Sequence, residues 1–173
     1  MTGRRATALA LAAFVALGMS SESLGVAWPS MSRSFGRPLA ELGLVVALSA
    51  CAYLLAAASS GWLVRRLGRG AVLVAALIAT SLGLSAYATG RWWPAVLIGA
   101  VALGSGGGLL DAGLNALAAL STSVRTVNLL HAGFGIGATL GPLLMTAAIG
   151  LSDSWRGGFA VLVVVHGALA VTF

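Results

Sequence analysis

Six long apolar segments limit what this chain can fold into. They cover approximately residues 7–28, 41–63, 71–89, 95–119, 129–149 and 158–173. About 20 apolar residues in a helix cross a hydrocarbon core of about 30 Å, and the breaks between these segments are short and carry turn or charge signals. The chain is only 8% charged, against about a quarter of the residues in a soluble domain, and its mean hydropathy is +1.00. We therefore predict an all-α membrane protein with six transmembrane helices, in one domain over residues 1–173.

The arginines predict an orientation, because arginine is retained on the cytoplasmic side of a membrane. The formal charge of +6 comes entirely from arginine. With the N-terminus inside, the inner breaks hold no acid and carry Arg4, Arg5, Arg65, Arg66, Arg69 and Arg125. The outer breaks offset their arginines with Glu41 and Asp153 and carry Arg33, Arg37, Arg91 and Arg156. We expect a multi-pass protein of a bacterial-type plasma membrane with both termini in the cytoplasm and no nucleic-acid-binding surface.

Two further features concern the ends of the predicted spans. Tryptophans near span ends are typical of membrane-interface anchors: Trp28, Trp62, Trp92, Trp93 and Trp155. The start "MTGRRATALALAAFVALG" resembles a secretory signal, but its apolar pattern continues through "VAWPSM". An uncleaved first span is the favoured interpretation.

Two acids, Glu22 and Asp111, lie inside predicted spans. A charge at the bilayer centre costs roughly 2.5 to 3.5 kcal/mol on insertion scales, so such residues usually face a protein interior or a water-filled cavity. At helical spacing each acid shares a face with small or polar residues: Gly18 and Gly25 for Glu22, and Gly104, Gly107, Gly108 and Asn115 for Asp111. Both acids are candidates for substrate or proton binding. The alternative, that each acid pairs with an arginine or a helix end to fix packing, stays open.

The fifth span has two different faces. One face carries Asn128, His131, Gly135, Ala138 and Pro142, and the other carries Gly133, Gly137 and Gly141. A repeated G-x-x-x-G ridge permits close helix contact in lipid, and Pro142 is expected to kink the helix. His131 is either a proton carrier or a packing residue. The sequence has no metal-ligand spacing and no set of nucleophile, base and orienting residue, so we expect no enzyme, no metal and no cofactor.

Several motifs together resemble the N-terminal half of the major facilitator superfamily. These are "GVAWPSM" followed by "FG", "GWLVRRLGRG", "GLLDAGLN" and "NLLHAGFGIGATLGP", and the closest branch resembles the fucose:proton symporters. The resemblance implies a half-bundle of two inverted three-helix repeats. It also implies a missing C-terminal six-helix half, so that the chain is expected to be truncated.

The resemblance implies roles for individual residues. It assigns proton coupling to Asp111 and substrate binding to Glu22 and Asn115, with Glu22 toward the outside, Asp111 toward the inside and no contact between them. Asn128 joins the substrate-binding candidates and His131 the proton-coupling candidates. The loop motif of the superfamily is retained at Gly61, Arg66, Gly68 and Arg69, but Arg65 stands where that motif usually has an acid.

Three functions are compatible with these observations. The favoured one is proton-coupled uptake of a small polar solute such as a sugar, with the solute, protons, the lipid bilayer and the second half as partners. An exporter of drugs or metabolites is the alternative within the superfamily. Gly137, Gly141 and Pro142 fit the start of the antiporter motif, whereas Met145 and Thr146 occupy its double-glycine positions. The third is a membrane assembly module that transports nothing.

Overall fold

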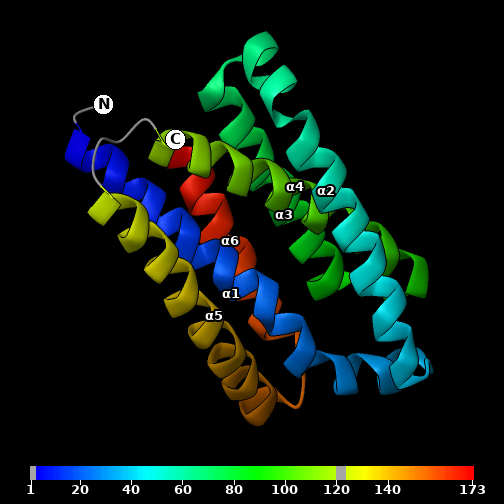
Figure 1. The fold of residues 1–173 in the computed structure, drawn as a ribbon. Helices are drawn as coiled ribbons and strands as arrows, with labels where there is room; N and C mark the ends of the chain where they lie inside the picture. Colours follow the sequence, from blue (N-terminus) through cyan, green and yellow to red (C-terminus); the bar gives the residue numbers. More distant parts are fainter. Residues whose placement is uncertain (1–2, 120–123) are drawn as a thin grey trace.

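The computed structural model describes residues 3–119 and 124–173, and its regular elements in these ranges are all helical (Figure 1). In chain order they are α1 (Gly3–Phe35), the short 3-10 helix η1 (Leu39–Glu41), α2 (Leu42–Leu67), α3 (Arg69–Thr89), α4 (Trp93–Ala119), α5 (Val124–Ser152) and α6 (Arg156–Thr172). The prediction of an all-α protein with six long helices is confirmed.

The lengths of the helices fit a membrane protein. Five of the described helices, α1 to α5, are long and apolar enough to cross a membrane. The sixth, α6, is apolar and has 17 residues. At about 1.5 Å per residue it measures about 25 Å, which is close to the lower limit for a spanning helix.

The first helix extends beyond its expected end at residue 28. It continues through Pro29 to Phe35. Two side chains of α1 then hold the connection to α2: the indole N–H of Trp28 donates to the carbonyl oxygen of Leu39 at 2.9 Å, and the hydroxyl of Ser32 donates to the carbonyl oxygen of Arg37 at 2.7 Å. The carbonyl oxygen of Leu39 also accepts the backbone N–H of Leu42, so the two side-chain bonds mainly attach α1 to the connection that follows it.

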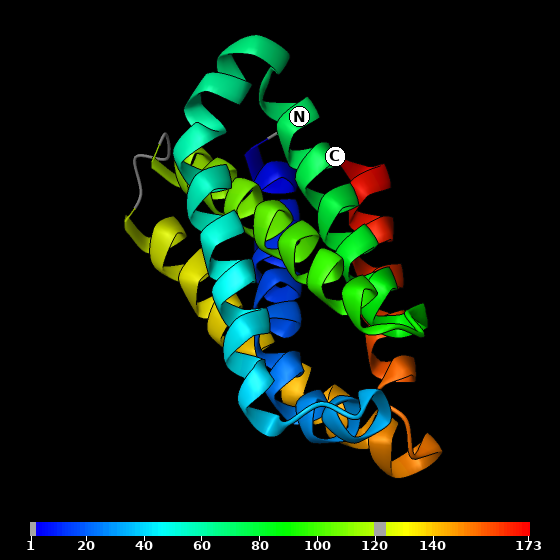
Figure 2. The same ribbon diagram turned by 90° about the vertical axis from the view of Figure 1, so that its right-hand side faces the viewer.

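The helices pack in a pattern related by a two-fold exchange of the two halves of the chain. The most extensive contacts join α1 to α5, α3 to α4, α2 to α4 and α3 to α6. Exchanging α1–α3 with α4–α6 converts the α1–α5 pair into the α4–α2 pair and leaves the α3–α6 pair unchanged. It converts the α3–α4 pair into the α6–α1 pair, which is also in contact but far less extensively. The views agree that α1 and α5 lie side by side, as do α2 and α4 (Figures 1 and 2). This is the arrangement expected of two inverted three-helix repeats.

The glycines of α5 lie against α1. A Cβ atom at Gly137 or Gly141 would collide with the carbonyl oxygen of Val15 or Met19, respectively, and one at Gly133 would meet the side chain of Leu11. All three glycines are buried. The G-x-x-x-G ridge therefore faces a neighbouring helix rather than lipid in this structure, and the helix continues through Pro142.

Two of the five tryptophans are not interface anchors. Trp28 and Trp155 are only 2% and 5% exposed, and the indole N–H of Trp155 donates to the carbonyl oxygen of Tyr87 at 3.3 Å. Trp62 and Trp92 are 50% and 62% exposed, as anchors would be. The sequence prediction was wrong for the buried pair because position at a helix end does not reveal which face of the helix a residue occupies.

The buried apolar residues form two clusters along the bundle. One lies toward the connection between α1 and α2 and includes Trp28, Leu84 and Phe159. The other lies toward the ends where α1 begins and α6 finishes, and includes Phe14, Leu77 and Leu114. The start of α1, the end of α6 and the turn between α2 and α3 all lie at one end of the bundle (Figures 1 and 2).

Candidate functional site

Asp111 is held by two neutral donors within the bundle. The phenol of Tyr53 on α2 donates to Oδ2 at 2.6 Å, and the amide of Asn115, one turn along α4, donates to Oδ1 at 3.0 Å. The ion pair found among the described residues is Arg37 with Glu41, on the surface. Asp111 is thus hydrogen-bonded at both oxygens, and no cationic side chain of the described helices neutralises it.

Two glycines of α4 explain why Tyr53 reaches Asp111. A Cβ atom at Gly104 would collide with the carbonyl oxygen of Ser49, and one at Gly108 would collide with that of Tyr53. Because only glycine allows two backbones to approach so closely, α2 crosses α4 directly beside Asp111. The sequence predicts a close neighbour on this face of α4, and the structure identifies that neighbour as α2.

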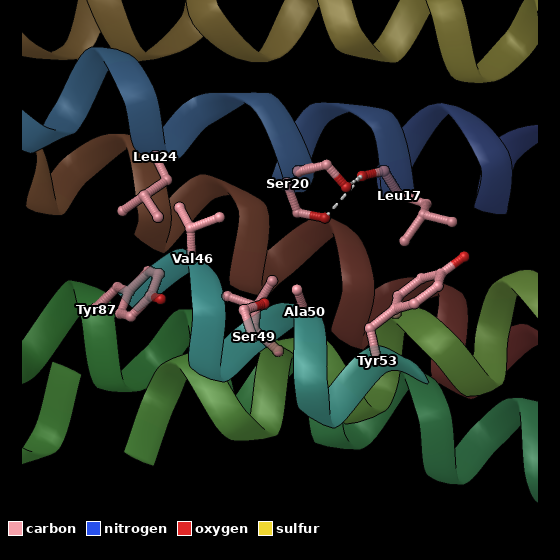
Figure 3. Close-up of a pocket in the computed structure, with 11 residues that line it drawn as sticks. Leu17, Ser20, Leu24, Val46, Ser49, Ala50, Tyr53 and Tyr87 are labelled. Carbon is pink, nitrogen blue, oxygen red and sulfur yellow. Dashed lines mark hydrogen bonds between the residues drawn. The ribbon is translucent and has the colours of Figure 1, made fainter. Parts of the chain in front are cut away.

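A cavity of about 220 Å³ lies beside this contact, between α1, α2, α3 and α4 (Figure 3). The polar residues that line it all carry hydroxyl groups: Ser20, Ser21, Ser49, Tyr53 and Tyr87. The remaining lining is apolar and consists of Leu17, Leu24, Val46, Ala50, Leu103 and Gly107. In the close-up, Tyr53 stands at one end of the cavity and Tyr87 at the other, with Ser49 between them. No charged side chain lines this cavity within the described residues.

The hydroxyls of α1 already donate to the backbone. Ser20 and Ser21 both donate to the carbonyl oxygen of Leu17, at 3.0 and 2.9 Å. Since a hydroxyl has one hydrogen and two lone pairs, these serines, and Tyr53 while its phenol donates to Asp111, offer mainly acceptor sites to a molecule in the cavity.

The cavity lies where the two apolar clusters meet. Leu17 belongs to the cluster at the end where α1 begins, whereas Leu24, Tyr87 and Leu103 belong to or pack against the other cluster. A break in the core near the middle of the helices is where a transporter places a solute site.

Glu22 lies near this cavity but does not meet Asp111. It follows Ser21, which lines the cavity, on α1, and its side chain is exposed. Within the described residues it forms no hydrogen bond or ion pair. The two acids are therefore separate sites in this structure.

Asn128 and His131 lie on a different part of the molecule. Both are exposed on α5, and the ring of His131 packs edge-on against Phe14 of α1, with ring centroids 5.6 Å apart. Neither residue lines the cavity or contacts Asp111 in the described structure.

The residues of the loop motif surround the turn between α2 and α3. Gly68 has a φ of +84°, a conformation that favours glycine, and α3 begins at the next residue. The guanidinium of Arg66 lies 5.1 Å from the ring centroid of Trp62. Arg69 and Gly61 line a small cavity between α2, α3 and α4, and neither arginine pairs with an acid among the described residues.

Sequence analysis missed Tyr53 and Ser49, as well as the other polar residues of the cavity, Ser20, Ser21 and Tyr87. A tyrosine within an apolar run is typical of a packing residue, so it attracts no functional assignment by itself. The available signal is that Ser49 and Tyr53 are four residues apart and therefore share one face of the second span.

Comparison with known proteins identifies the family. A family model described as the Major Facilitator Superfamily matches residues 9–173. A search of curated proteins gives no match to the chain. The family match extends over all six helices, and it agrees with the paired arrangement of the two halves. The superfamily expected from the sequence motifs is confirmed, and the fucose:proton symporter branch stays a prediction. The chain belongs to the Major Facilitator Superfamily of membrane transporters.

Proposed function

We propose that this chain forms half of a proton-coupled transporter that takes up a small polar solute such as a sugar. The observation that carries the proposal is the Asp111 carboxylate, which has hydrogen-bond donors on both oxygens, no cationic partner in the described structure, and a hydroxyl-lined cavity beside it. Ionisable residues inside spans commonly mark ion and substrate pathways. In this function Asp111 takes up and releases the coupled proton.

The other site residues have roles in binding. Asn115 orients Asp111 through its amide and binds solute when the proton is bound. Glu22 binds the solute from α1, next to the serines of the cavity. Asn128 and His131 act from the exposed face of α5, Asn128 on the solute and His131 on the proton.

The size and chemistry of the cavity support a small solute. Pockets for drug-sized ligands have volumes of roughly 300 to 1,000 Å³ and mainly apolar linings. The cavity beside Asp111 has a volume of about 220 Å³ and hydroxyls from three helices. These properties favour sugar-like solutes over a drug exporter.

A second six-helix bundle completes the transporter in this proposal. The exposed faces of α2 and α5 support a second bundle, because these two helices are the least buried of the five long helices. The two-fold exchange relates α2 to α5. Large apolar side chains are exposed on both: Leu44, Val46, Leu54 and Leu55 on α2, and Leu129, Ile136, Leu140 and Leu143 on α5. In the assembled transporter these faces contact the second half, and the outer faces of the bundle contact lipid.

The test is to separate proton coupling from solute exchange. The full-length transporter is expressed, reconstituted in lipid vesicles and supplied with tritiated hexoses. Asp111→Asn keeps the size of the side chain and its contact with Tyr53, so the variant should fold. It should lose uptake against a gradient by at least about 10-fold, while counterflow, which needs no net proton movement, should stay within about 3-fold of the parent.

Asn115→Ala serves as the matched variant. It removes the second partner of the carboxylate and is expected to weaken solute affinity while uptake remains driven by the proton gradient. Accumulation by Asp111→Asn at the level of the parent protein would show that the carboxylate only fixes packing.

A further inference from the structure

Tyr53 is the side chain shared by the cavity and the carboxylate. Its ring forms one end of the cavity (Figure 3), and its hydroxyl donates to Oδ2 of Asp111 at 2.6 Å. Its backbone is fixed against α4, because Gly108 leaves no room for a side chain between the two helices. Tyr53 is therefore placed to respond both to a molecule in the cavity and to the state of Asp111.

The two oxygens of Asp111 differ in what their partners can do. Oδ1 faces the amide NH₂ of Asn115, which only donates. Oδ2 faces a phenol oxygen, which can donate one hydrogen or accept one. A proton arriving at Asp111 is consequently accommodated on Oδ2, where the new acid O–H can donate to Tyr53.

Other titratable groups near α4 do not take part in this arrangement. The helices packed against α4 carry Glu22 on α1, Tyr87 and Arg69 on α3, and His131 on α5. None of these described side chains forms a hydrogen bond or ion pair with Asp111. On α2, Tyr53 is the contact, and Arg65 and Arg66 lie in the last turn, away from the cavity.

We propose that Tyr53 is a positioning residue whose hydroxyl changes from acceptor to donor toward the cavity when Asp111 is protonated. With Asp111 ionised, the phenol hydrogen is committed to Oδ2, and the cavity receives only lone pairs from Tyr53. With a proton from hydronium on Oδ2, which leaves a water molecule, the acid donates to the phenol oxygen, and the phenol hydrogen is released for a solute. The transferred proton stays on Asp111, and no bond of Tyr53 breaks.

The chemistry of the cavity then selects the class of solute. Ser20 and Ser21 already donate to the backbone and offer acceptors. The protonated site adds one donor from Tyr53. A neutral molecule with neighbouring hydroxyls, which can donate to the serines and accept from Tyr53, is held best in the protonated state. This inference about solute rests on the proposed uptake function, whereas the reversal of the Tyr53–Asp111 bond does not.

Infrared difference spectroscopy tests the reversal without any transport. The protein in lipid vesicles is labelled with ring-deuterated tyrosine, and spectra are recorded as the medium is acidified. This chain contributes two tyrosines, Tyr53 and Tyr87, and substituting either one identifies its band by difference, whatever tyrosines a second half contributes. We expect the carboxylic acid band of Asp111 to appear together with a shift of a tyrosine C–O–H band.

Three variants make the assignment. Tyr53→Phe and Asp111→Asn should each abolish the acid-induced tyrosine shift, and Tyr87→Phe, which changes the cavity at its other end, should retain it. The absence of a coupled tyrosine shift in the unsubstituted protein, or its survival in Tyr53→Phe, would overturn the proposal. If a variant folds poorly, the spectra of the unsubstituted protein still test the proposal, because the absence of a coupled tyrosine shift there would contradict it.

Transport of tritiated hexoses tests the solute class separately. Tyr53→Phe should raise KM for uptake by roughly 2- to 10-fold, the effect of one neutral hydrogen bond, with a smaller change in the maximal rate. Unchanged KM would overturn the link between Tyr53 and the solute. Absence of hexose transport by the unsubstituted protein would instead contradict the proposed function, and the infrared result would stand by itself.

Discussion

At the scale of single residues, Arg156 has a structural role that its sequence position does not reveal. Its guanidinium donates to the carbonyl oxygens of Ala88 and Gly90 at 2.9 and 2.8 Å, at the end of α3. It also lies 4.9 Å from the ring centroid of Trp155. From sequence it is only one of the arginines that indicate topology. The structure shows that it supplies donors to carbonyls that have no helical partner.

Arg156→Ala should therefore destabilise the contact between α3 and α6. Hydrogen bonds from a charged donor contribute about 1.5 to 3 kcal/mol each, and partial exposure of this group places the expected loss toward the lower value. Thermal unfolding in detergent measures the change. Arg33→Ala is the control, because exposed Arg33 makes only a 3.3 Å contact to the hydroxyl of Ser30; equal losses for the two variants would contradict the capping role.

The site residues show how far single-sequence reasoning extends. Asp111 and Asn115 are predicted because a carboxylate in an apolar run is costly, and the four-residue spacing alone predicts that they share a face. Tyr53 contacts Asp111 from another helix, and such a pairing depends on how α2 crosses α4. Periodicity within one helix carries no information about that crossing.

At the scale of elements, the glycine ridges lie where two helices approach each other most closely. In α5, Gly137 and Gly141 bring the backbone of α1 into contact, and in α4, Gly104 and Gly108 do the same for α2. The sequence predicts that each ridge faces something close, because glycines at a four-residue spacing form a flat surface. It does not predict the partner, since any helix with small or flexible residues can occupy such a surface.

Gly137→Leu should disrupt the α1–α5 pair. The new side chain would collide with the carbonyl oxygen of Val15, part of rigid helix backbone, so the two helices must separate. Gly135→Leu is a matched control on the same helix, because the space beside Gly135 is open. We expect a loss of monodisperse protein of more than about 5-fold for Gly137→Leu in detergent, consistent with overpacking costs of about 1 to 3 kcal/mol or more. Comparable yields from both variants would place the ridge against lipid.

At the scale of the whole molecule, the ends of the bundle differ in charge. The arginines near the turn at Gly68 lie at the end where α1 begins and α6 finishes (Figures 1 and 2). The opposite end holds the connection around Arg37 and Glu41, which form an ion pair at 3.6 Å. The start of α1 and the end of α6 lie at the same end of the bundle, as an even number of membrane crossings would require (Figures 1 and 2). Which side is the cytoplasm depends on the membrane, and the arginine asymmetry is the basis for predicting it.

Cysteine labelling on intact cells tests that orientation. This chain has one cysteine, Cys51, which is exposed on α2, so Cys51→Ser, with any cysteine of a second half also replaced by serine, provides a background without thiols. Leu67→Cys and Trp92→Cys then place a single thiol at opposite ends of the bundle, at positions that are 59% and 62% exposed.

The arginine-rich end is expected to stay in the cytoplasm because moving its charges across the bilayer is costly. A maleimide that cannot cross membranes should therefore label Trp92→Cys on intact cells and leave Leu67→Cys unlabelled, whereas permeabilised cells should label both variants. Labelling of Leu67→Cys alone on intact cells would reverse the orientation, and it would place the Asp111 end of the site on the outer side of the membrane.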